Sequence, residues 1–138
     1  MTQPGPRTYT GSCHCGAVRF EAELDLGEPI GRCNCTLCTK ASLSSIIVKP
    51  SAFKLLSGES SLSDYHREDN PTRFPFCKVC GIRSFGHGHL EELGGDYVSV
   101  NANCLDDVDL IGAKFVYWDG RHNNWDAGPR DQPWPIAP

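Results

Sequence analysis

The amino-acid sequence predicts a mainly β fold in which bound zinc stabilises a single domain. Short segments rich in β-branched and aromatic residues are broken at close intervals by Gly, Asn and Pro, a pattern typical of short strands joined by turns. Seven of the eight cysteines fall into three short clusters whose spacing is typical of metal sites. The chain has 138 residues, a usual length for one domain, so we expect one zinc-binding domain over residues 1–138.

The first elements surround the first two cysteine clusters. Residues 8–24 end in alternating apolar positions at Val18, Phe20 and Ala22, which predict a strand entered from a tight turn at Gly16. The second cluster precedes "TKASLSSIIV", where a short helical turn should give way to a β-branched strand that ends before Pro50. The second cluster is therefore expected on a loop capped by a short helix.

The remaining elements are short β segments followed by an irregular end. Strands are predicted in "FKLLSGESSLSDYHR", "TRFPFC", "IRSFGHG", "DYVSVNANC" and "AKFVYWDG", and residues 126–138 read as an irregular Pro-rich tail. His87 and His89 should follow a strand as solvated loop residues. Core packing is expected for five aromatic residues near the later cysteines and the last β segment: Phe74, Phe76, Phe85, Trp118 and Trp125.

Charge and hydropathy argue against nucleic acid and membranes as partners. The formal net charge is -4, and Lys and Arg are scattered singly, so no basic patch is visible. No apolar run approaches the roughly 18 residues of a membrane span, and "MTQPGPRTYT" lacks the pattern of a signal peptide. We therefore expect a cytoplasmic protein, in which reduced thiols bind metal more readily than they form disulfides.

Two of the cysteine clusters share a feature that predicts one closed zinc site. Both "CHCG" and "CKVCG" place Gly directly after the last cysteine, at Gly16 and Gly81, where a positive φ lets the chain turn tightly around an ion. Two similar halves make a tetrahedral set of four thiolates, here called the four-cysteine cluster: Cys13, Cys15, Cys77 and Cys80. A structural zinc there would contribute on the order of 10 kcal/mol, comparable with the net stability of a domain.

The other cluster supplies only three ligands. Cys33, Cys35 and Cys38, here called the three-cysteine cluster, predict a second zinc with an open position, and therefore two zincs per chain. Alternatively, Cys104 in "NANCLDD" completes a second closed site, although a single cysteine at a strand end is more often a small buried residue. Zinc with three thiolates is a weak Lewis acid, so an open site favours a soft fourth ligand such as a small-molecule thiol.

These motifs resemble the glutathione-dependent formaldehyde-activating enzymes, a family grouped with centromere protein V. The matching segments are "GSCHCGAVRFE", "GRCNCTLCTKAS", "FPFCKVCGIRSF" and, more loosely, "VSVNANCLDD", so the resemblance covers about residues 8–125. It implies a β-tent fold of small antiparallel sheets, a structural zinc on the four-cysteine cluster and a catalytic zinc on the three-cysteine cluster. It also implies a carbon-sulfur lyase that forms S-hydroxymethylglutathione reversibly from glutathione and formaldehyde.

Two readings without catalysis remain open from the residues alone. Paired Cys-x2-Cys turns often only hold a binding surface together, as in a zinc-ribbon interaction module. An exposed set of three thiolates also suits a thiol-redox sensor or a metal reservoir.

Overall fold

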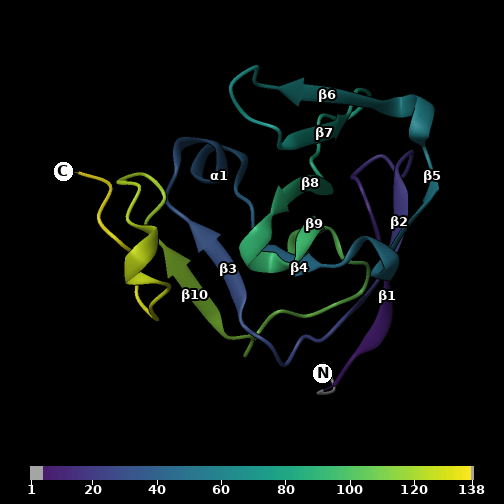
Figure 1. The fold of residues 1–138 in the computed structure, drawn as a ribbon. Coiled ribbons are helices and arrows are strands. Elements are labelled where there is room, and N and C mark those ends of the chain that lie inside the picture. Colours follow the sequence, from purple (N-terminus) through teal and green to yellow (C-terminus); the bar gives the residue numbers. More distant parts are fainter. Residues whose placement is uncertain (1–4, 138) are drawn as a thin grey trace.

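The computed structural model describes residues 5–137, which form two sheets and one α-helix (Figure 1). The smaller sheet is antiparallel and has the strand order β1-β2-β5. Its strands are β1 (Arg7–Ser12), β2 (Arg19–Leu24) and β5 (Phe53–Ser57). The mainly β class predicted from the sequence is confirmed.

The larger sheet has seven strands in the order β10-β3-β4-β9-β8-β7-β6. They are β3 (Ile30–Cys33), β4 (Ser45–Val48), β6 (Leu62–His66), β7 (Arg73–Cys77), β8 (Phe85–Leu90), β9 (Gly95–Asn101) and β10 (Phe115–Trp118). Neighbouring strands run antiparallel except β10 and β3, which are parallel and pair Trp118 with Cys33. Because β3 and β10 are parallel, the loops that follow them leave the sheet at the same end, next to each other.

The helices are short. The α-helix α1 (Thr36–Ala41) follows β3, in the region where the sequence predicted a short helix. The cysteines are not on a loop before it, however, because Cys33 ends β3 and Cys38 lies within α1. Single 3-10 turns connect other elements: η1 (Pro50–Ala52), η2 (Glu59–Ser61), η3 (Glu91–Leu93), η4 (Ala102–Cys104) and η5 (Trp125–Ala127). No helix within residues 5–137 has the length and apolar character needed to cross a membrane.

The core lies where the inner faces of the two sheets meet. Alternate residues of β2 are buried, as the period of a strand requires. Ile46 and Val48 of β4 and Val98 and Val100 of β9 pack in the same cluster. The ring of Phe85 lies 4.8 Å from that of Phe53 and 6.3 Å from that of Phe20, measured between centroids. These contacts join β8 to the smaller sheet across the core.

Two expectations about side chains differ from the structure. His87 and His89 lie within β8, where their backbones pair with β9, rather than in a loop after it. Of the five aromatic residues expected in the core, only Phe85 is buried, whereas Trp125 is 50% exposed. The reason is that Phe74 and Phe76 lie on the half-buried face of β7, opposite Pro75 and Cys77, while Trp118 is half-buried at the end of β10.

The C-terminal segment packs against the edge strand. Beyond η5 it contains no further helix or paired strand up to residue 137, but Tyr117 and Arg130 exchange two backbone hydrogen bonds. The indole of Trp134 donates to the carbonyl of Tyr117 at 2.8 Å, and the guanidinium of Arg130 stacks on the Trp134 ring. This segment therefore lies against β10, close to the carboxyl ends of β3 and β10.

Candidate functional site

The structure brings the sulfurs of the four-cysteine cluster together from two distant turns. One turn follows β1 and the other begins at the end of β7, and the four sulfurs lie within 4.8 Å of one another. The Sγ atoms of Cys13 and Cys15 are 3.7 Å apart, as are those of Cys15 and Cys77. A zinc–sulfur bond of about 2.3 Å gives a tetrahedron with edges of about 3.8 Å, so this spacing fits a zinc ion.

The two turns of this cluster have the same local construction. The backbone N–H of Cys13 donates to the carbonyl of Val18, five residues on, and the N–H of Cys77 donates to that of Ile82 in the same way. Gly16 and Gly81 both have a φ of +82°, a conformation that favours glycine. The shared glycine of the two motifs therefore has a structural cause.

Backbone donors stabilise thiolates in this cluster. The N–H of Val18 lies 3.3 Å from the sulfur of Cys13. Hydrogen bonds from the backbone of Cys15 and of Ile82 lower the pKa of Cys80 to about 6. Because thiolates are the form of cysteine that binds metal, these donors prepare the cluster for a cation.

The three-cysteine cluster lies where β3 ends and α1 begins. Its sulfurs are within 4.8 Å of one another. Cys35 occupies the N-cap position of α1, and its sulfur accepts the backbone N–H of Cys38 at 3.3 Å, in the place usually taken by a Ser or Asp oxygen. The N–H of Cys35 in turn lies 3.5 Å from the sulfur of Cys33. The helix start thus fixes the positions of the sulfurs.

The three thiols perturb one another strongly. Hydrogen bonds from Cys33 and Cys38, together with the backbone N–H groups of Cys38 and Leu37, lower the pKa of Cys35 to about 2. The hydrogen bond to Cys35 raises the pKa of Cys33, and hydrogen bonds to Cys33 and Cys35 raise the pKa of Cys38. The three sulfurs therefore lie close enough to share one cation, and the backbone donors at Cys35 favour its thiolate, the form of cysteine that binds metal.

No fourth side chain completes the three-cysteine cluster. Within residues 5–137, no ligand atom of another His, Cys, Asp or Glu lies within 4.8 Å of all three sulfurs. Cys104 lies elsewhere: its sulfur faces the carbonyl of Arg83 at 3.8 Å, and burial raises its pKa. The alternative in which Cys104 closes a second four-thiolate site is therefore wrong in this structure.

A buried polar network joins the three-cysteine cluster to the loop after β10. The side-chain amide of Asn34, the residue between Cys33 and Cys35, donates to Asp119 Oδ1 at 2.8 Å. Asp119 is only 5% exposed, and it also contacts His122 Nδ1 at 2.7 Å and accepts from Asn124 at 3.3 Å. Burial alone would raise the pKa of Asp119, but these hydrogen bonds outweigh burial and lower it.

Gly120 and two tryptophans border the sulfur of Cys33. A Cβ atom at Gly120 would overlap Cys33 Sγ and lie 2.8 Å from the ring of Trp125. The ring of Trp125 is half exposed and lies 6.2 Å from that of Trp118, measured between centroids. The absence of a side chain at Gly120 therefore leaves room for the sulfur next to an apolar wall.

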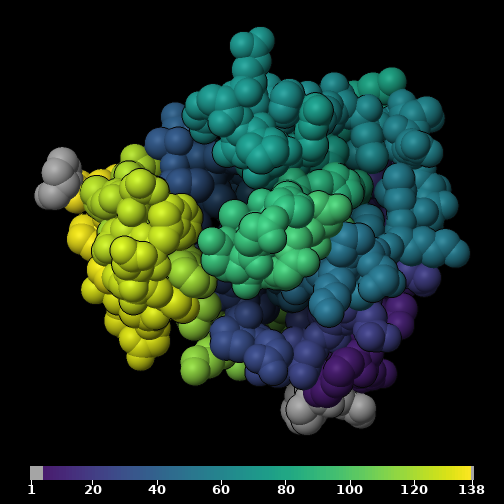
Figure 2. Space-filling model, in the orientation of Figure 1, coloured from purple at the N-terminus to yellow at the C-terminus, as the bar shows by residue number. Residues whose placement is uncertain are grey.

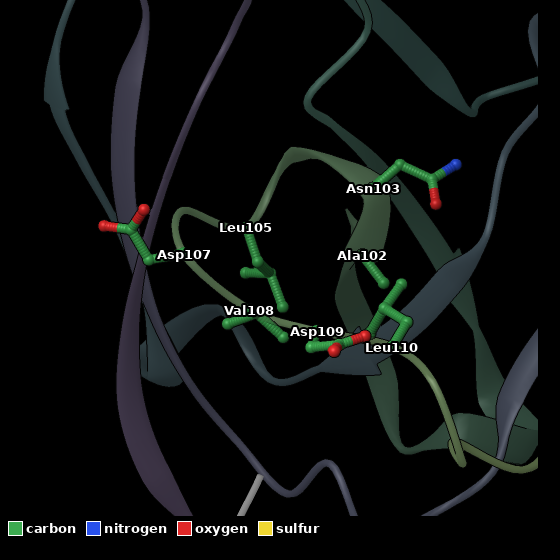
Figure 3. Close-up of a pocket in the computed structure, with 7 residues that line it drawn as sticks. All are labelled: Ala102, Asn103, Leu105, Asp107, Val108, Asp109 and Leu110. Carbon is green, nitrogen blue, oxygen red and sulfur yellow. The ribbon is translucent and has the colours of Figure 1, made fainter. Parts of the chain in front are cut away.

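The region of α1 borders a hollow in the surface. In Figure 2 a hollow is bounded by the blue region of α1, the teal β6–β7 hairpin, the green β8 region and the yellow C-terminal segment. Burial raises the pKa of Tyr97. A separate cavity is lined by aliphatic and acidic side chains and the amide of Asn103, all between residues 102 and 110, and contains none of the clustered cysteines (Figure 3).

Cysteine spacing identified the two clusters, whereas their surroundings could not be identified in this way. All seven sulfurs that the sequence assigned to metal lie in the two groups expected, and the assignment to zinc stays a prediction. Asn34, Asp119, Gly120 and Arg121 were missed. In the sequence, Asn34 is only a polar residue between two cysteines, and the other three form a turn-like "WDGR" segment. Neither pattern predicts that Asn34 and Asp119, 85 residues apart, form a hydrogen bond.

Comparisons with known proteins agree with the motifs. A family model described as "Glutathione-dependent formaldehyde-activating enzyme" matches residues 8–120. A Halomonas elongata protein named "Putative glutathione-dependent formaldehyde-activating enzyme" is 50% identical over 32 residues. This alignment spans 23% of the chain and 20% of that relative.

A solved structure extends the likeness to the fold. The crystal structure of a Rhodobacter sphaeroides protein matches with a TM-score of 0.63 and 26% sequence identity. The match covers 91% of this chain and 99% of that protein. Because the family model spans most of the sequence and includes all seven clustered cysteines, the chain belongs to the glutathione-dependent formaldehyde-activating enzyme family.

Proposed function

We propose that the chain is a zinc-dependent carbon-sulfur lyase that forms S-hydroxymethylglutathione reversibly from glutathione and formaldehyde. The observation that carries this proposal is the three-cysteine cluster, in which three sulfurs converge and no fourth side chain joins them within residues 5–137. Family membership supports glutathione and formaldehyde as the reactants.

The two clusters have different roles in this proposal. The four-cysteine cluster supplies a complete tetrahedral donor set and ties the turn after β1 to the end of β7, which suits a structural zinc. The three-cysteine cluster suits a catalytic zinc. A zinc ion held there would keep one position for an incoming thiol and lower the pKa of that thiol.

The chain positions the reactants around the three sulfurs. The N–H groups of Cys35 and Cys38 hold two of the sulfurs in place, and the Asn34–Asp119 hydrogen bond fixes the loop between them. Trp125 offers an apolar surface next to Cys33. In the reaction the thiol loses its proton, its sulfur forms a bond to the formaldehyde carbon, and the carbonyl oxygen takes up a proton. The reverse reaction breaks the same carbon-sulfur bond.

Domain organisation and location complete the proposal. Both sheets contribute to one core, which supports a single zinc-binding domain over residues 1–138. All eight cysteines are free, which fits the reducing cytoplasm.

Cobalt substitution tests the proposal directly. Cobalt(II)-loaded protein should show visible bands that move towards a four-thiolate pattern when glutathione is added, and move again when formaldehyde follows. Cys35→Ser should lose both responses and keep the bands of the four-cysteine cluster. If neither glutathione nor another small thiol changes the bands of the wild-type protein, thiol capture is excluded and an interaction module or metal reservoir becomes the better reading.

A further inference from the structure

Arg121 is held against the loop that carries the three-cysteine cluster. Its Nε donates to the backbone carbonyl of Asn34 at 2.8 Å, and its backbone N–H donates to Asn34 Oδ1 at 2.9 Å. Asn34 lies between Cys33 and Cys35, so both contacts dock the arginine beside the sulfurs. The guanidinium thus has a fixed place at the edge of the proposed thiol site.

The charge of this guanidinium is not neutralised by the protein. Within residues 5–137, Arg121 forms no ion pair with a carboxylate within 4.0 Å, and no hydrogen bond involves its two Nη nitrogens. Asp119 lies two residues away, but its oxygens already contact Asn34, His122 and Asn124. A partly buried cation whose outer donors are free is a ready site for an anion.

The charge of the three-cysteine cluster explains why an anionic substrate needs such a cation. Three thiolates outweigh the charge of one divalent ion, and the chain as a whole carries a formal net charge of -4. A thiol that bears carboxylates would therefore be repelled as it approached the sulfurs. A guanidinium beside the cluster offsets this repulsion, and its planar pair of donors matches the two oxygens of a carboxylate.

We propose that Arg121 binds a carboxylate of the thiol substrate and so selects thiols that carry one. This inference rests on the proposed function, because it assumes that a thiol enters the three-cysteine cluster. The expected substrates are then small anionic thiols, a class that includes glutathione. The Nη donors of Arg121 would favour these over thiols that lack a carboxylate.

A titration of cobalt-loaded protein with two related thiols tests the role of Arg121. Glutathione carries two carboxylates, whereas its diethyl ester has the same thiol and no carboxylate. Since hydrogen bonds to charged groups are among the stronger ones, wild-type protein should bind glutathione about tenfold or more tightly than the ester. Arg121→Gln should remove that preference by weakening glutathione alone, and Arg121→Lys should restore part of it.

Two controls separate binding from folding. Arg7→Gln changes an exposed arginine on β1, far along the chain from this loop, and should keep the wild-type preference. The visible bands of cobalt-loaded Arg121→Gln before thiol addition should match those of the wild type, because the sulfurs are unchanged.

The outcomes distinguish this inference from the proposed function. If wild-type protein binds glutathione and the ester equally well, or if Arg121→Gln keeps the preference, Arg121 does not recognise the carboxylate, although thiol capture stands. If Arg121→Gln weakens both thiols equally, Arg121 only supports the loop and the inference is wrong. If neither thiol changes the wild-type bands, the proposed function itself fails.

Discussion

Gly120 shows how a single residue limits the geometry of the three-cysteine cluster. Its backbone does not need the positive φ that favours glycine, so the requirement for a small residue comes from its neighbours alone. A Cβ atom there would overlap the sulfur of Cys33 and crowd the ring of Trp125. The site therefore depends on close packing between the loop after β10 and the end of β3.

We predict that Gly120→Ala weakens metal and thiol binding at the three-cysteine cluster while the fold is kept. The added methyl group must displace Cys33 Sγ or Trp125, and a ligand sulfur moved by even a few tenths of an ångström disturbs the donor set. Competition with a chelator should show at least about a tenfold loss of affinity at this cluster.

Gly31→Ala is the matched control for this prediction. Gly31 lies on β3, and a Cβ there would make only ordinary contacts, at 3.6 Å from the carbonyl of Ser45 and from Trp118. This variant should keep the wild-type affinity for metal. Equal affinities for the Gly120 variant and the wild type would show that the sulfur adjusts without loss.

At the scale of elements, the two cysteine turns of the four-cysteine cluster are near copies that come from different parts of the chain. One joins β1 to β2 and the other follows β7, yet both close with the same five-residue backbone hydrogen bond and the same glycine φ of +82°. A Cβ at Gly16 or Gly81 would meet no atom within 4 Å. The glycines are therefore needed for backbone conformation rather than for space.

Substitutions at Gly81 should show whether glycine is needed there for its positive φ or for lack of space. Because a left-handed conformation costs most residues roughly 1–2 kcal/mol, Gly81→Ala should lower the free energy of unfolding by about that amount. Gly81→Asn should lower it less, since Asn tolerates positive φ better, even though its side chain is larger. Chemical denaturation at saturating zinc measures both variants, and a larger loss for Asn would point to crowding instead.

The same comparison of elements explains what the sequence could predict. The three-cysteine cluster was predictable because its ligands are close in the chain, and the four-cysteine cluster because its two halves share a Cys-Gly ending. The strands β2 and β4 were predictable from their alternating or β-branched residues. The parallel pairing of β3 with β10 was not, because nothing in four-residue strands specifies a partner across the chain. Arg121, Asp119 and Gly120 reach the site only through that pairing, so they could not be assigned from spacing.

At the scale of the whole molecule, the two clusters differ in how far apart in the chain the segments they join are. The four-cysteine cluster joins segments 62 residues apart, as the contact between Cys15 and Cys77 shows, whereas the three-cysteine cluster lies within a single turn of chain. A metal ion bound to the first would link β1–β2 to β7. A metal ion bound to the second would join only neighbouring residues, so we expect the sheets and their core to persist without it.

This difference predicts unequal effects of Cys→Ser substitutions. Wild-type protein, fully loaded, should contain close to two zinc ions per chain. Cys80→Ser should fold poorly, because a structural zinc contributes on the order of 10 kcal/mol, as much as the net stability of many domains. Cys35→Ser should keep the wild-type circular dichroism spectrum and bind one zinc.

Elemental analysis and circular dichroism on the purified variants measure these outcomes. One zinc in the wild-type protein, with the remaining thiols free, would contradict the assignment of two metal sites. Equal unfolding of both variants would show that the three-cysteine cluster is structural.

The parallel pairing of β3 with β10 also sets the order in which the site is completed during synthesis. Asn34 and Asp119 are 85 residues apart, and a ribosome adding about 5–20 residues per second needs about 4–17 s to cover that distance. Cys33, Cys35 and Cys38 emerge early, whereas the residues that pack beside them emerge near the end. During those seconds the nascent chain carries three closely spaced thiols without the loop that packs beside Cys33 and Asn34 in the finished protein, so the site is most open to oxidants and stray electrophiles while it is being made.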